Sequence, residues 1–157
     1  MPFIGIISEE NQENCVRREI LNNLNLRESS VLFIKEKSIE DIQNIEFETV
    51  VITRKFKDIE NLKELLKGVK YIIINSDIET NLELLDDIEA TIITYGFNSK
   101  ATITASSVSD DEILLCIQRN ITNKEGKIIE PQEIKVEIIE NTNCTLAVQS
   151  VLLLYKK

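Results

Sequence analysis

Short runs of β-branched and aliphatic residues recur through the first hundred residues of the chain, and they predict strands. Each run is apolar at successive positions, as expected of strands that are buried on both faces of a parallel sheet. Polar segments of helical character separate the runs, and this alternation predicts βαβ units around a mainly parallel sheet. The five predicted strands span residues 3–7, 31–34, 49–52, 71–75 and 91–94.

The polar segments carry apolar residues at helical spacing, so that each has one apolar stripe. We therefore expect helices over residues 10–25, 59–67 and 79–87, and a helical turn over 38–43. Asp58 is a suitable N-cap for the second helix, and Gly68 stands where a C-cap glycine belongs. These segments would cover the faces of the sheet.

The pattern changes after Tyr95-Gly96, where two further strands are predicted at residues 101–107 and 111–120. Ile134, Val136 and Ile138 alternate with charged residues, as in a strand with one face in solvent. A turn at 122–127 precedes that strand, and Asn141 is placed to cap a last helix over 142–154. We expect one α/β domain over residues 1–157, with a mainly parallel Rossmann-like sheet flanked by helices, a C-terminal antiparallel β extension and a final helix.

The charge balance restricts the partners that the chain can have. Among 157 residues, Asp and Glu outnumber Lys and Arg by 27 to 18, which gives a net charge of −9. A negative field repels phosphate backbones and anionic lipids, so we expect no nucleic-acid partner and no membrane association. No run approaches the ~18 apolar residues of a membrane span, and the first residues lack the pattern of a signal peptide.

The cysteines favour a reducing compartment. Cys15, Cys116 and Cys144 are odd in number and far apart, and no CxxC pair occurs. We expect reduced thiols and a cytoplasmic protein. Cys116 lies in an apolar run and is interpreted as a small buried hydrophobic residue.

The chain has no histidine, which limits the available chemistry. Ser-His and Cys-His nucleophilic sites, histidine metal sites and histidine general bases are all excluded. Two acidic runs remain as a potential cation site, but neither has the spacing of a calcium loop, so a solvated charge run is the favoured interpretation. The runs are Asp86, Asp87 and Glu89, and Asp110, Asp111 and Glu112. We expect no metal site and no enzymatic activity.

The turn after the first strand is where α/β folds hold phosphates, because a helix N-terminus and glycines meet there. Here Ser8 is followed by Glu9, Glu10 and later Glu13, without a glycine or a lysine. Carboxylates repel phosphate but suit the first turn of a helix. An acidic helix start is therefore favoured over a phosphate site.

A second candidate site lies at the ends of the next three strands. Thr53-Arg54, Asn75-Ser76-Asp77 and Tyr95-Gly96 would meet at the carboxyl edge of the sheet, where open α/β folds bind ligands. The same residue types also end strands because they form turns. Both interpretations remain open at this point.

Four segments in order resemble the central domain of the Mur ligases. Residues 69–77 end in Asn-Ser-Asp, where that family has a strand ending in Asn-Ala-Asp-Asp, and residues 90–101 contain the family's Tyr-Gly before an antiparallel layer. Residues 47–54 resemble the strand that ends in Thr-Asn, and 141–148 resemble the helix start His-Asn-x-x-Asn-Ala-x-Ala-Ala. The resemblance covers almost the whole chain as one shortened domain.

The departures from the family deny the ligase reaction. The Gly-Thr-Asn-Gly-Lys-Thr loop that binds ATP in the family is replaced by residues 5–13, and we expect none of the family's flanking substrate domains. The resemblance thus implies a non-catalytic domain without a cofactor, acting through a protein partner or self-association. Weak binding of a nucleotide or UDP-sugar is the alternative. The family's site residues survive at Thr53, Asn75, Asp77, Tyr95, Gly96 and Asn141.

Overall fold

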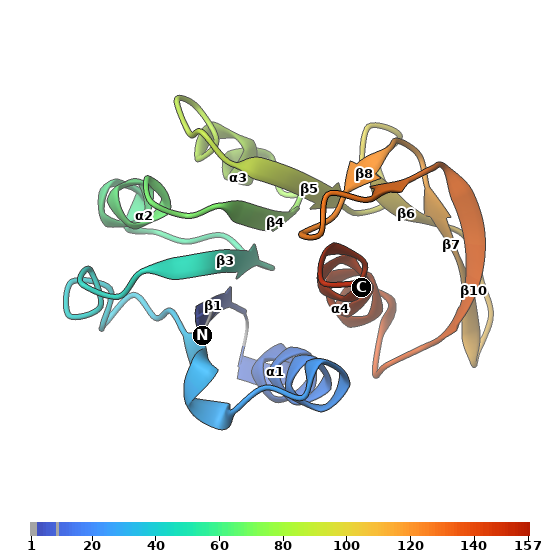
Figure 1. Cartoon of the computed structure of the whole chain (residues 1–157), viewed down its shortest axis with the longest axis horizontal. Helices are drawn as coiled ribbons and strands as arrows, with labels where there is room; N and C mark the ends of the chain where they lie inside the picture. The colour runs from blue at the N-terminus through green and yellow to red at the C-terminus, as the bar shows by residue number, and fades with distance from the viewer. Residues whose placement is uncertain (1–2, 9) are drawn as a thin grey trace.

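An eight-stranded sheet forms the centre of the molecule in the computed structural model, which describes residues 3–8 and 10–157. Across the sheet the strands follow the order β10-β7-β6-β5-β4-β3-β1-β2, so β10 and β2 are its two edges (Figure 1). The parallel part consists of β2, β1, β3, β4 and β5. These strands are Phe3–Ile7 (β1), Val31–Phe33 (β2), Phe47–Ile52 (β3), Tyr71–Asn75 (β4) and Thr91–Tyr95 (β5). The predicted α/β fold with a mainly parallel sheet is confirmed.

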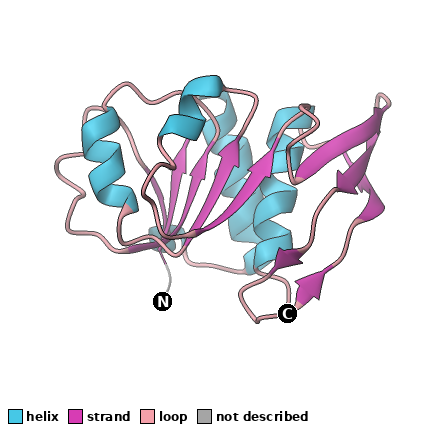
Figure 2. Ribbon diagram, turned by 90° about the horizontal axis from the view of Figure 1, so that it is seen from above, coloured by secondary structure: helices cyan, strands magenta, loops and turns pink. Residues whose placement is uncertain are grey.

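Helices cover both faces of the parallel strands, and the sheet separates the interior into two hydrophobic cores. The helices α1 (Glu10–Leu24) and α4 (Thr142–Leu154) pack on one face, where Ile6, Ile73 and Val148 are fully buried. On the other face, α2 (Ile59–Leu66) and α3 (Glu79–Glu83) cover a core of aliphatic residues and Phe56 (Figures 1 and 2). The apolar character of the strands on both faces follows from this three-layer arrangement.

The expected helix caps are present at two helix starts. The Asp58 carboxylate accepts a hydrogen bond from the backbone N–H of Asn61 at 3.2 Å, and the Asn141 side chain accepts one from the N–H of Cys144 at 2.8 Å. Gly68 follows the end of α2, but it does not have the left-handed φ of a C-cap glycine, because the helix ends in a tight turn of right-handed backbone at Lys67. Residues 36–44 form successive turns without a helix.

The C-terminal strands form the antiparallel extension, as predicted. The strand β6 (Ile103–Val108) touches β5 through one parallel pair and then pairs antiparallel with β7 (Glu112–Ile117), which pairs with β10 (Gln132–Glu137). Figure 1 shows these strands curving around α4. Two further elements were not expected: a small hairpin of β8 (Ile121–Thr122) and β9 (Ile128–Ile129), and a short 3-10 helix, Glu28–Ser30.

The cysteine prediction is wrong in two respects. Cys15 in α1 and Cys144 in α4 form a disulfide, although both were expected to be reduced thiols. The helices pack side by side, and their tertiary contact brings together two residues that are 129 positions apart. Cys116 is a free thiol and only half-buried, because it lies on the face of β7 that is turned away from α4.

Candidate functional site

Five of the six candidate residues lie at the carboxyl edge of the parallel sheet. Thr53 follows β3, Asn75 ends β4 and Tyr95 ends β5, and these three strands are neighbours. Asn75 and Tyr95 are paired across the ladder, and Asp77 and Gly96 continue from them. Asn141 begins α4, and no hydrogen bond among the described residues joins it to the other five.

Asp77 holds the loop that follows β5. Its carboxylate accepts backbone N–H bonds from Phe97 at 2.8 Å and Asn98 at 3.0 Å, and a side-chain bond from Asn98 Nδ2 at 2.7 Å. Partial burial raises the pKa of this carboxyl, but the hydrogen bonds from Asn98 and Phe97 outweigh it and hold the pKa below its ordinary value. The carboxylate oxygens are thus engaged within the fold.

Gly96 is required for this contact. Its φ is +152°, which L side chains rarely adopt, and a Cβ at this position would lie 2.6 Å from Asp77 Oδ1. Only a residue without a side chain lets the Asp77 carboxylate approach the backbone of the loop so closely.

Thr53 and Asn75 are also bonded within the protein. The buried Thr53 hydroxyl donates to the Ile7 carbonyl at 2.8 Å, which ties the ends of β3 and β1 together. The buried Asn75 side chain accepts from the backbone N–H of Asp77 at 3.0 Å, and Asn81 Nδ2 donates to the Asn75 carbonyl. These bonds are the turn-forming roles that their residue types favour at strand ends.

Three buried polar side-chain atoms at this edge have no hydrogen-bond partner among the described residues: Ser8 Oγ, Arg54 Nε and the Tyr95 hydroxyl. Ser8 follows β1 and Arg54 follows β3, and the strand order reverses between these two neighbours, because the chain continues from β1 to β2 on one side and from β3 to β4 on the other. Burial, with a contribution from the charge of Asp77, raises the pKa of Tyr95 far above its ordinary value. The hydroxyl therefore remains a protonated donor.

The acidic turn proposed at the start of the first helix is only partly visible. Glu9 lies outside the described residues, as do the side chains of residues 10–14, and the helix backbone begins at Glu10 as α1. The other acidic runs lie apart in the fold, between α3 and β5 and at the β6–β7 turn. Within the described part of the chain, no group of three or more His, Cys, Asp or Glu side chains is placed to hold a metal ion.

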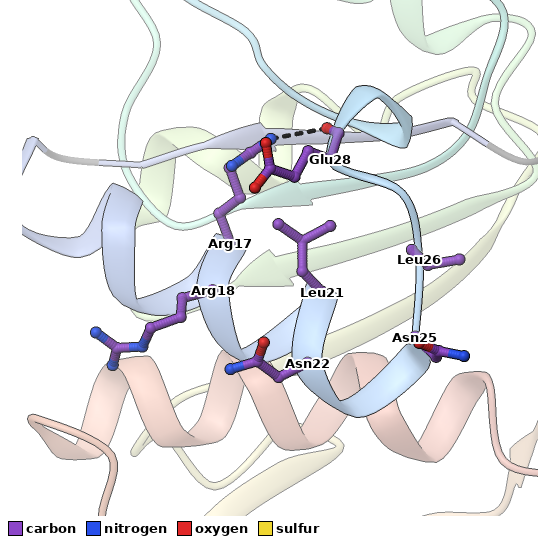
Figure 3. Close-up of a pocket in the computed structure, with 7 residues that line it drawn as sticks. All are labelled: Arg17, Arg18, Leu21, Asn22, Asn25, Leu26 and Glu28. Atoms are coloured by element: carbon purple, nitrogen blue, oxygen red, sulfur yellow. Dashed lines mark hydrogen bonds between the residues drawn. The ribbon is translucent and has the colours of Figure 1, made fainter.

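A surface hollow of about 640 Å³, which no sequence pattern indicated, lies between α1 and the segment leading to β2 (Figure 3). Arg17 supports its upper wall by donating to the carbonyls of Val31 and Glu28, at 3.0 and 2.7 Å. In Figure 3 the Arg18 side chain points away from Arg17, and it lies within 4.0 Å of carboxylates of Glu19 and Glu140. The two guanidinium groups therefore do not converge on one anion.

The sequence patterns also did not predict a polar cluster at the opposite end of the sheet. The Tyr155 hydroxyl lies 2.5 Å from Thr49 Oγ1, while Lys124 Nζ pairs with Glu48 at 2.5 Å and lies over the Tyr155 ring. Burial is the main cause that raises the pKa of Tyr155. These contacts fasten the end of α4 to β3, which is a structural role.

Among the described residues no helix is long and apolar enough to span a membrane. Comparison with the models of known protein families and with curated proteins finds no match. The site geometry and the motif order along the chain therefore carry the functional argument.

Proposed function

We propose that the chain is a non-catalytic domain of Mur-ligase-like architecture that works by binding a protein partner or by assembling with itself. The observation that carries this proposal is the position of Asp77. Its carboxylate accepts three hydrogen bonds from the Phe97-Asn98 loop, and Gly96 leaves room for the carboxylate because it has no side chain.

The other retained motif residues support the same reading. Thr53 ties β3 to β1, Asn75 orders the turn after β4, and Asn141 caps α4. Each side chain therefore has a role in the scaffold that persists without a ligand. A domain that has lost the glycines and lysine of a phosphate loop but keeps these contacts retains its fold while lacking the means to bind ATP phosphates.

The ATP-consuming reaction of the Mur ligases gives the direct test. Purified protein with ATP and Mg²⁺ should release no more phosphate than a preparation from vector-only cells, because no lysine or glycine-rich turn follows β1 to neutralise the phosphates. Turnover above that control, co-purifying with the chain, would contradict the proposal.

A small-molecule binding role is the second candidate, and the unpartnered buried groups favour it. A ligand that accepts from the Tyr95 hydroxyl and Arg54 Nε and bonds Ser8 would satisfy polar atoms whose burial otherwise costs about 1–3 kcal/mol each. Nucleotides and UDP-sugars are the probes that the resemblance suggests for this edge of the sheet.

Thermal unfolding with millimolar nucleotides and UDP-sugars tests this candidate. A ligand present at 100 times its Kd should stabilise the protein by about 2.7 kcal/mol, and Tyr95→Phe should reduce the shift because it removes one donor. Tyr71→Phe, at the other end of β4 and β5, is the matched control and should keep the full shift. Unchanged melting with every probe would remove this candidate.

A further inference from the structure

The strand β10 presents an open backbone edge. Among the described strands it pairs with β7 alone, and it ends the sheet. The N–H of Ile138 donates to the Asp111 carbonyl at 2.9 Å, in register with the β7–β10 ladder. Because backbone groups alternate in direction along an antiparallel strand, Ile134 and Val136 bond toward β7, while Glu133, Lys135 and Glu137 turn their N–H and C=O groups outward.

The side chains of this edge are also divided between two faces. Ile134, Val136 and Ile138 are half-buried against the core under α4, whereas Lys135 and Glu137 are exposed on the opposite face. Neither of these two has an ion pair among the described residues, and Glu137 lies directly opposite Glu112 of β7. Like charges in that position disfavour the isolated edge.

We infer that β10 pairs antiparallel with β10 of a second copy of the chain, about a two-fold axis through Val136. This inference rests on the proposed function and names the partner. In this register Lys135 of each copy faces Glu137 of the other, and both residues exchange their outward backbone hydrogen bonds. The added lysine lies beside the Glu112–Glu137 pair and offsets its repulsion.

The apolar face is equally self-complementary in this register. Val136 meets Val136, and Ile134 meets Ile138, so the half-exposed aliphatic residues of both copies become cross-strand pairs. A two-fold pairing of this kind closes after two copies, which protects the β10 edge of each copy from further strand addition.

Two neighbouring registers are less favourable. A two-fold axis through Lys135 would set Lys135 against itself and Glu133 against Glu137, so every charged pair would repel. An axis through Ile134 would pair Lys135 with Glu133, but it would set Gln132 against Val136 and Pro131, which has no N–H, against Glu137. Of these three registers, only the one with its axis through Val136 pairs opposite charges on one face and aliphatic residues on the other.

Charge reversal and charge exchange test the inference by sedimentation velocity over a wide range of protein concentration. The unmodified chain should dimerise reversibly. Lys135→Glu should raise the dimer Kd at least about tenfold, because two attractive pairs become repulsive. The double variant Lys135→Glu with Glu137→Lys should restore dimerisation, because the exchange re-creates both opposite-charge pairs.

Lys100→Glu is the matched control, since it makes the same change in net charge at an exposed site outside β10 and should leave the Kd unchanged. Circular dichroism should show all variants folded, because the altered side chains are exposed. A chain that remains monomeric at all concentrations overturns the inference. A dimer that Lys135→Glu leaves intact also overturns it. The double variant Lys135→Glu with Glu133→Lys should not restore dimerisation, and restoration by this variant instead of by the Glu137 exchange would likewise overturn the inference. These results leave the non-catalytic function itself untouched, because only the ATP turnover experiment would overturn it.

Discussion

Replacing Cys144 with alanine should lower the free energy of unfolding more than any other single change considered for this chain. The disulfide between Cys15 and Cys144 closes a loop with a sequence separation of 129. In the chain-entropy description, a loop of this length constrains the unfolded state by about 5 kcal/mol. For a domain of this size, the melting temperature should fall by about 10–20 °C. Urea unfolding of the oxidised protein and the variant measures the difference.

Two controls identify the disulfide as the cause. Cys116→Ser should have a small effect, because Cys116 is a half-buried free thiol. Reduction should destabilise the unmodified chain but not Cys144→Ala. In denaturant, the oxidised chain should present one reactive thiol and the reduced chain three. Three reactive thiols in protein purified without a reductant would contradict the disulfide.

The second large effect is expected at Gly96. Gly96→Ala should lower the free energy of unfolding by about 2–4 kcal/mol, because it adds backbone strain and displaces the Asp77 carboxylate from the loop. The added Cβ would meet both carboxylate oxygens of Asp77 at under 3 Å. Chemical denaturation monitored by circular dichroism gives the magnitude.

A comparison with Gly126 separates backbone strain from steric conflict. Gly126 also has a positive φ, of +80°, but no atom lies within 4 Å of the site of an added Cβ. Gly126→Ala should therefore cost only about 1 kcal/mol, from backbone strain alone. Equal losses in the Gly96 and Gly126 variants would show that the contact with Asp77 contributes nothing.

The elements that the sequence predicted well are those determined by local patterns. The β-branched runs locate the parallel strands within a few residues, and Asp58 and Asn141 mark two helix starts because N-capping depends only on nearby backbone groups. The candidate residues at strand ends also meet at one edge, since all parallel strands point the same way.

The parts that escaped prediction depend on tertiary packing. Cys15 and Cys144 are paired because α1 and α4 lie together, which no spacing in the sequence reveals. The sequence pattern places Asp77 at a strand end and so makes it a candidate ligand. It does not reveal the hydrogen bonds of Asp77 to the Phe97-Asn98 loop, because these depend on the tertiary structure. The unpartnered Ser8, Arg54 and Tyr95 groups likewise depend on which side chains surround them.

The position of α4 has a consequence for how the chain reaches its native state during synthesis. This helix is made after every strand of the sheet, yet Leu146, Val148 and Val151 are fully buried beneath the strands and α1. Until α4 docks, the part of this apolar face that α1 does not cover is open to water and to other chains. Chains truncated before residue 142 should therefore refold poorly and bind chaperones readily.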